Sequence, residues 1–204
     1  MHRSLALAGL LAVLAAPAAA QTISTPIYKG PYHDFRNSEL AGYISDPGSG
    51  ISIALQGEYR RVTSRFDYGL TFGYLDPSGP GSGIFGIGVD GRASVARRTQ
   101  DFPLDASLTL GLGGLIQSGD IGFILPIGIS LGRQVLLEES KISFTPYVNP
   151  VIAPVFGSDN VVGNDVLFGL GLGVDISLSP RTDVRLSAGL GDLDGVGVGL
   201  AWHR

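Results

Sequence analysis

The sequence contains no cysteine, few charged residues and only three histidines, and each shortage excludes a class of chemistry. Without cysteine there are no disulfides, no thiolate metal sites and no lipid attachment through an N-terminal thiol. Charged residues make up 16% of the chain, against about 25% in ordinary soluble domains. The net charge of −4 gives no strongly basic surface for nucleic acid. We therefore predict no cofactor, no metal site and no nucleic-acid partner.

Long apolar runs are also missing, apart from one short stretch near the N-terminus. Residues 5–14 are apolar, follow the basic Arg3 and precede the small residues Ala18, Ala19 and Ala20. This order is typical of a secretory signal peptide with an A-x-A cleavage site, and the run is too short to span a membrane. We predict that residues 1–20 are a cleaved signal peptide of bacterial type, with an uncleaved anchor as the alternative.

Glycine, in contrast, is abundant, and it alternates with large apolar residues. The chain has 31 glycines, about twice the usual share. In "LFGLGLGVDISLS", residues 167–179, large apolar side chains occupy the even-numbered positions from Phe168 to Leu178. Glycine, Asp175 and Ser177 occupy the odd-numbered positions between them. A period of two predicts a β-strand. Similar segments recur from residue 39 onward, separated by turn signals such as "DPGSG", "QSGD" and "GDLDG". We predict an all-β chain of about ten antiparallel strands over residues 39–204, with eight strands as the alternative.

The two faces of these strands distinguish two kinds of closed barrel. A soluble, lipocalin-like barrel buries its bulky face, whereas a membrane barrel turns that face outward. A glycine-rich outer face would solubilise poorly and weaken the strands, so we favour a closed antiparallel up-and-down transmembrane β-barrel with a narrow lumen. Aromatic side chains near both strand ends indicate membrane-interface belts, and Tyr43 is expected in one of them. The other interface aromatics that we predict are Tyr59, Phe66, Tyr74, Phe85, Phe123, Phe156, Phe168 and Trp202.

The charges in the turns sort by sign when the strand count is ten. With both termini at one end, the loops at the far end contain Asp46, Asp76, Asp120, Asp159, Asp165, Asp192 and Asp194. The turns at the terminal end contain Arg61, Arg65, Arg97, Arg98, Arg133, Lys141 and Arg181. A shifted strand count would mix the two sets. We predict that the termini and the basic turns lie in the periplasm, where they can contact anionic headgroups.

Three prolines occupy positions of one parity in "FTPYVNPVIAPVF". Residues of one parity in an antiparallel strand bond to the same neighbour, and proline has no N–H to donate. Pro146, Pro150 and Pro154 therefore predict that this strand forms the loosest seam of the barrel or carries a bulge. The stretch "IGFILPIGISL", residues 121–131, is predicted as one continuous strand.

Residues 21–38 show no clear period. We predict that they form an N-terminal periplasmic segment, a partial plug or an extra strand. They contain His33 beside Asp34, an adjacent acid–base pair, with Ser38 nearby. A dipeptide in a tail is not a catalytic constellation, so we predict no catalytic residue and no enzymatic activity. Asp192 and Asp194 are typical of a tight turn, with weak binding of a divalent cation as the alternative.

The signal, the glycine-rich alternating strands and the ending "DLDGVGVGLAWHR" together resemble small bacterial outer-membrane β-barrel proteins of eight to ten strands. The resemblance implies a Gram-negative outer membrane, contact with its lipids, and recognition of the last strand by the barrel-assembly machinery. Val196, Val198, Leu200 and Trp202 supply the alternating terminal strand, although a further dipeptide follows the aromatic residue. The resemblance implies no activity, because a fold does not determine a function.

Charges on the glycine-rich face are the functional candidates of the barrel. Inside a narrow lumen they need partners or water, so they either pair and plug the interior or line a cation-favouring pore. They are Glu58, Arg60, Asp67, Asp90, Arg92, Asp105, Asp175 and Arg185. We predict a non-enzymatic protein with a structural or surface-interaction role and a plugged or very narrow lumen. The alternatives are a porin-like narrow pore for ions or small solutes and a lipid-acting outer-membrane enzyme.

Overall fold

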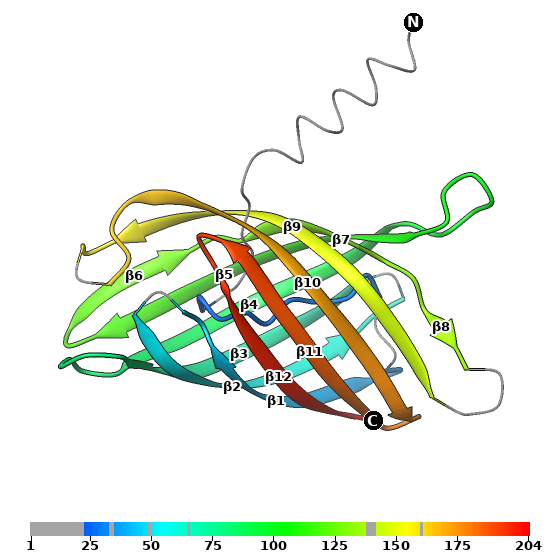
Figure 1. Ribbon diagram of the computed structural model, residues 1–204, viewed down its shortest axis with the longest axis horizontal. Coiled ribbons are helices and arrows are strands. Elements are labelled where there is room, and N and C mark those ends of the chain that lie inside the picture. Colours follow the sequence, from blue (N-terminus) through cyan, green and yellow to red (C-terminus); the bar gives the residue numbers. More distant parts are fainter. Residues whose placement is uncertain (1–22, 33–34, 49, 65, 138–141, 160) are drawn as a thin grey trace, which may run out of the picture.

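The computed structural model is an antiparallel β-barrel (Figure 1). It describes the chain except for residues 1–22, 33–34, 49, 65, 138–141 and 160. The predicted signal peptide therefore lies outside the described residues. In the described part of the chain, no helix is long and apolar enough to cross a membrane. The strand segments are β1 (Ser38–Asp46), β2 (Ile51–Val62), β3 (Phe66–Pro77), β4 (Ile84–Ala96), β5 (Asp105–Gln117), β6 (Asp120–Ile124), β7 (Ile127–Gly132), β8 (Val135–Leu136), β9 (Ser143–Gly157), β10 (Asp165–Ser179), β11 (Thr182–Gly191) and β12 (Gly195–His203).

The sheet closes because the first strand pairs with the last. β1 runs antiparallel to β12, with Glu39 opposite His203 and Asp46 opposite Val196. β6 and β7 both lie between β5 and β9, end to end, so they act as one interrupted strand. The short β8 only extends the edge of β9. The barrel thus has ten strands in its wall, which confirms the predicted fold and strand count over the alternative of eight.

Apolar side chains cover the outside of the wall. Along β1 the exposed fraction alternates from 59% at Leu40 to 4% at Ala41, and from 6% at Tyr43 to 44% at Ile44. The same alternation runs through the other strands, and Phe72, Phe85 and Trp202 are more than half exposed. Outward apolar bulk and inward small or polar residues are the arrangement of a transmembrane barrel. A lipocalin-like barrel would show the opposite arrangement.

The two ends of the barrel differ in their connections. We call the end with Ser38 and His203 the terminal end and the opposite end the far end. At the far end, β5 and β6 are joined by only Ser118 and Gly119, whose φ angles are +52° and +96°. Positive φ at both central residues is the signature of a type I′ hairpin turn, whose twist matches that of the strands. Tight far-end turns of this kind keep adjacent strands in register.

Two expectations about the wall are wrong in detail. Tyr43 does not join an outer aromatic belt, because it lies on the inward parity of β1 and is only 6% exposed. The stretch predicted as one strand over 121–131 is interrupted at Leu125 and Pro126. Proline cannot donate to the ladder, and the backbone continues with the same register on both sides of the break.

The interruption lies on the seam from which the prolines of β9 remove backbone donors. Leu125 N donates to Pro154 O at 2.9 Å, and Arg133 N donates to Pro146 O at 3.3 Å. The carbonyls of these prolines therefore face β6 and β7, and the N–H groups that proline lacks would have faced the same way. On the other side, β9 pairs with β10 in an unbroken register from Ser143 to Val155. The missing donors are thus concentrated on one seam.

Candidate functional site: the filled lumen

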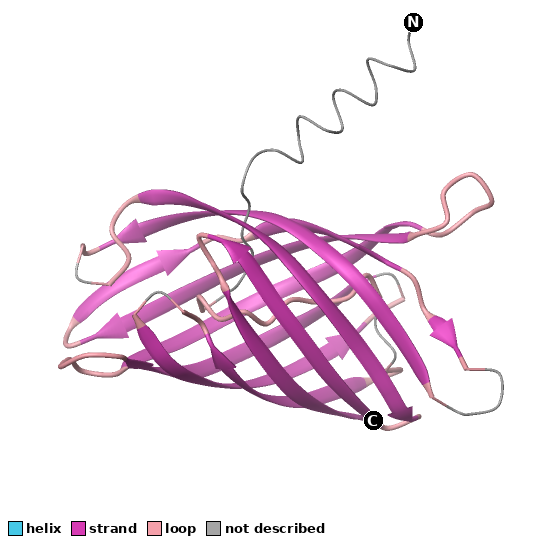
Figure 2. Cartoon of the chain, viewed as in Figure 1, coloured by secondary structure: helices cyan, strands magenta, loops and turns pink. Residues whose placement is uncertain are grey.

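The chain before β1 runs through the inside of the barrel. Ile23 packs at the far end against Ala54, Leu75 and Leu115, all of them buried. At the terminal end, the ring of Phe35 lies 5.8 Å from that of His203, centroid to centroid. Figure 2 shows this irregular path enclosed by strands, and Figure 1 shows it in dark blue between the walls. We call residues 23–32 the plug segment; it crosses the lumen from the far end toward the terminal end.

Lumen side chains hold the plug segment mainly by its backbone carbonyls. Arg92 Nη1 donates to Gly30 O at 2.6 Å, and Ser130 Oγ donates to Lys29 O at 2.7 Å. Further donors are Tyr147 to Tyr28 O at 2.9 Å, Asn149 to Lys29 O at 3.4 Å, Ser107 to Pro31 O and Ser187 to Pro26 O. The donors come from β4, β5, β7, β9 and β11. An extended chain without its own ladder thus has its buried carbonyls satisfied by the wall.

Glycines on the inner face make room for the aromatic residues that fill the lumen. A Cβ added at Gly171 in β10 would collide with the ring of Tyr28 in the plug segment. A Cβ added at Gly199 in β12 would collide with the ring of Tyr43. The glycine-rich face of "LFGLGLGVDISLS" therefore faces the plug segment and lumen tyrosines. Close backbone approach is a recognised reason for glycine within a strand.

Lys29 of the plug segment completes a charge network in the middle of the lumen. Its Nζ lies 2.7 Å from Glu58 Oε1, and Glu58 also pairs with Arg60. Arg60 reaches Asp90 at 2.6 Å and also pairs with Asp67, which accepts from Arg92 at 2.8 Å. We call this set the central network: Lys29, Glu58, Arg60, Asp67, Asp90 and Arg92. It contains three cations and three carboxylates, so Lys29 brings it to charge balance.

A second charge cluster lies at the terminal mouth of the lumen. Arg185 Nη1 donates to Glu39 Oε1 at 2.7 Å and to Tyr43 Oη at 2.9 Å. Asp175 lies opposite Arg185 in the register of β10 and β11, with Nε and Oδ1 3.8 Å apart. His203 Nε2 lies 3.1 Å from Glu39 Oε2 and 3.0 Å from Asp183 Oδ2. We call this set the mouth cluster: Glu39, Asp175, Asp183, Arg185 and His203.

Two spaces of very different size lie beside the plug segment. A cavity of about 40 Å³ lies beside Lys29, Asp90 and Asn149, which is room for very few water molecules. A larger polar vestibule of about 690 Å³ opens beside Pro31 and Tyr32 and is lined by Arg92, Arg97, Arg98 and Asp105, among others. Thr25, Ile27, Tyr28 and Lys29 of the plug segment line the small cavity, and its Pro31 and Tyr32 line the vestibule.

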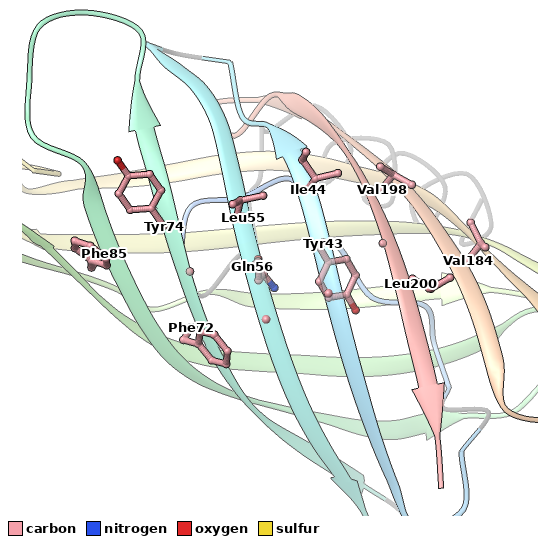
Figure 3. Close-up of a pocket in the computed structure, with 14 residues that line it drawn as sticks. Tyr43, Ile44, Leu55, Gln56, Phe72, Tyr74, Phe85, Val184, Val198 and Leu200 are labelled. Carbon is pink, nitrogen blue, oxygen red and sulfur yellow. The ribbon is translucent and has the colours of Figure 1, made fainter.

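An apolar groove lies on the wall itself. It crosses β12, β1, β2 and β3, has a volume of about 750 Å³ and includes the backbone of Gly42 and Gly57 (Figure 3). These two glycines are partners in the register of β1 and β2. Phe72 covers Gly57, whereas a Cβ at Gly42 would meet no atom within 4 Å. Ile44, Leu55 and Leu200 border the groove, so its walls suit acyl chains.

The predicted site residues fall into three places. Seven of the eight predicted lumen charges belong to the central network or the mouth cluster, while Asp105 lines the vestibule and accepts from Arg98 N at 3.1 Å. The predicted interface aromatics all lie on outward-facing positions of their strands. The sequence did not connect Glu39, Asp183 and His203, because only the closure of β1 on β12 brings them together. His33 and Asp34 lie outside the described residues.

Comparison with known proteins gives structural likeness alone. No protein-family model matches the sequence, and no curated protein matches it. Among solved structures, the chain is similar to a bacterial polysaccharide outer membrane secretin, with a TM-score of 0.47 and 13% identity over 85% of this chain and 66% of that chain. It therefore spans slightly less than two thirds of that protein.

Two further solved structures are similar over most of their own length. The β domain of the Bordetella autotransporter BrkA gives a TM-score of 0.49 and 14% identity, covering 82% of each chain. The Acinetobacter baumannii outer membrane protein Omp33 gives 0.39 and 9% identity, covering 83% of this chain and 99% of that chain. All three are bacterial outer-membrane β-barrel proteins. The closed ten-stranded barrel confirms the predicted resemblance to that class at the level of fold.

Proposed function

We propose that this protein is a non-enzymatic β-barrel of the Gram-negative outer membrane with a structural or surface-interaction role, its lumen closed by its own plug segment. The observation that carries the proposal is the fixation of that segment. Side chains from five strands bind its carbonyls, and Lys29 balances the central network. A solute would have to break these contacts to pass. The lumen thus serves to hold the plug segment and not to conduct.

The proposed orientation places the terminal end in the periplasm and the acidic far-end loops outside the cell. Basic turn residues such as Arg97, Arg98 and Arg181 then lie near the inner leaflet, where anionic headgroups attract them. The far-end connections are short, which favours contact with lipids or broad surfaces over elaborate ligand recognition. In this orientation, β12 presents Val196, Val198, Leu200 and Trp202 for recognition by the barrel-assembly machinery.

A narrow, gated pore is the second candidate. It is favoured by the polar vestibule at the terminal end, which already reaches as deep as Arg92 and Asp67. Withdrawal of the plug segment would remove Lys29 and leave the central network with one excess negative charge. Such a lumen would favour cations. An enzyme acting on lipids is supported by no cluster described above, and His33→Ala, which we expect to be silent, tests it.

Planar-bilayer recording separates a closed barrel from a pore. We expect the full mature chain to show no discrete conductance at any holding voltage. Lys29→Glu sets a like charge beside Glu58 and should loosen the plug segment, so that brief cation-selective openings appear. Lys29→Arg keeps the charge and should stay silent. Steady conductance in the wild type would reject the closed-barrel proposal in favour of the pore.

A further inference from the structure

We propose that Glu39, Asp183 and His203 bind one divalent transition-metal ion such as zinc at the terminal mouth of the lumen. The three side chains come from the adjacent strands β1, β11 and β12. Their donor atoms all lie within 4.8 Å of one another. The side chains of Glu39, Asp183 and His203 are 0%, 1% and 4% exposed, so the ion would be almost fully enclosed by protein.

Charge balance distinguishes this place from the rest of the lumen. The central network matches three carboxylates with three cations. The mouth cluster holds the carboxylates of Glu39, Asp175 and Asp183 against a single guanidinium, that of Arg185. Metal binding requires a neutral imidazole at His203, and in that state the cluster carries two uncompensated negative charges, whereas an imidazolium between Glu39 and Asp183 leaves one. Buried charges need compensation, and one divalent cation supplies the two positive charges that are missing.

Four of the nine buried side-chain atoms without a hydrogen-bond partner in the described chain belong to the mouth cluster, and two of these four are on His203 and Asp183. His203 Nε2 lies about equally far from two carboxylate oxygens, yet among the described residues it forms no aligned hydrogen bond to either. Asp183 Oδ1 is likewise buried without a hydrogen-bond partner in the described chain. Buried polar atoms in native proteins are normally satisfied by protein or by ordered water. A shared metal ion between these donors would satisfy them together.

The donor set indicates the class of metal. An imidazole nitrogen with two carboxylate oxygens suits zinc and its neighbours in the first transition series. Calcium and magnesium prefer oxygen ligands throughout. Arg185 would act as a positioning residue, because its Nη1 and Nη2 donate to Glu39 Oε1 and Oε2 at 2.7 Å and 2.5 Å and so fix the carboxylate whose Oε2 also lies near His203. Such outer partners commonly orient metal ligands.

The test measures metal binding by the full mature chain, folded in detergent without an affinity tag and first stripped with a chelator. Zinc is titrated in competition with a chromophoric chelator. We expect one zinc ion per chain, and at least a tenfold loss of affinity in His203→Gln. The matched control is His33→Gln, which removes the other histidine of the mature chain and should bind as the wild type does. Absence of stoichiometric binding, or unchanged binding in His203→Gln, would overturn the proposal.

A second measurement does not depend on whether a variant of the last strand folds. Cu²⁺ replaces zinc in the wild type and in His33→Gln, and electron paramagnetic resonance reads the ligands directly. We expect coupling to the nitrogen of a single imidazole in both proteins. Asp183→Asn should keep that nitrogen signal but weaken the binding. A spectrum without imidazole coupling, or one lost in His33→Gln, would assign the metal elsewhere and reject the site.

Discussion

At the scale of single residues, the glycines of this barrel have two different roles that the amino-acid composition does not distinguish. Gly42 and Gly199 lie on neighbouring strands, but Gly42 faces the outer groove and Gly199 faces the ring of Tyr43. The alternation predicted glycine toward the lumen, which holds for β10 and β12. Gly42 occupies the bulky parity of β1, so composition alone could not show that the wall has a depression there.

The same substitution at these two glycines should act in opposite directions. Gly42→Ala meets open space, so we expect the free energy of unfolding to rise by about 0.5–1 kcal/mol from reduced backbone entropy. Gly199→Ala places a methyl group against the ring of Tyr43 and should lower the free energy of unfolding by about 1–3 kcal/mol. Urea unfolding in lipid vesicles, followed by heat-modifiable gel mobility, measures both. Equal effects would mean that the aromatic ring moves aside without cost.

We expect Lys29 to contribute more to the free energy of unfolding than any surface lysine or arginine. Removing one partner of a buried ion pair costs about 3–5 kcal/mol when the other charge is left alone, and here Glu58 keeps Arg60 as a partner while the central network loses one of its three cations. Glu58 is fully buried, and we expect Lys29→Met to destabilise the barrel at the lower end of that range. Arg181→Met removes an exposed charge and should change stability by no more than about 0.5 kcal/mol. Similar values for both variants in the urea assay would show that the plug segment does not rely on its charge.

At the scale of elements, the prediction that one seam of the wall is the loosest still awaits a measurement, although the structure shows which seam it is. Parity alone indicated that Pro146, Pro150 and Pro154 would weaken a single seam, and the structure identifies it as the one toward β6 and β7. The break at Pro126 was missed, because the apolar alternation continues through it. Periodicity describes side chains, whereas the ladder depends on backbone donors.

Hydrogen exchange should detect this seam directly. We expect amides of β7 that face β9 to exchange faster than amides of β10 that face β9, whose register is unbroken. Pro150→Ala restores one donor opposite Ile129 and should stabilise the seam by about 1 kcal/mol, the usual net value of a hydrogen bond. Equal protection on both sides of β9 would show that the prolines do not weaken the wall.

At the scale of the whole molecule, the barrel and most of its lumen charges were predictable, whereas a partial plug was only one of three alternatives for the chain before β1. Ten strands followed from alternation and from the sorting of turn charges, both of which are local or additive signals. The sequence of the plug segment, residues 23–32, has no period, because its partners are side chains from several strands around the wall. The prediction for Tyr43 was wrong because a tyrosine fits in this lumen only where a glycine on the neighbouring strand makes room for its ring.

The direction of the plug segment has a mechanical consequence. Its attachment to β1 is at the terminal end, whereas Ile23 lies at the far end. The described part of the segment therefore lies along the lumen, so a pull from the terminal end would act along its length. Such a pull would break the contacts of the plug segment with the wall one after another. The segment would stay covalently attached to β1 and could therefore return to the lumen. If the proposed orientation and the gated-pore alternative both hold, such a pull would have to come from the periplasm.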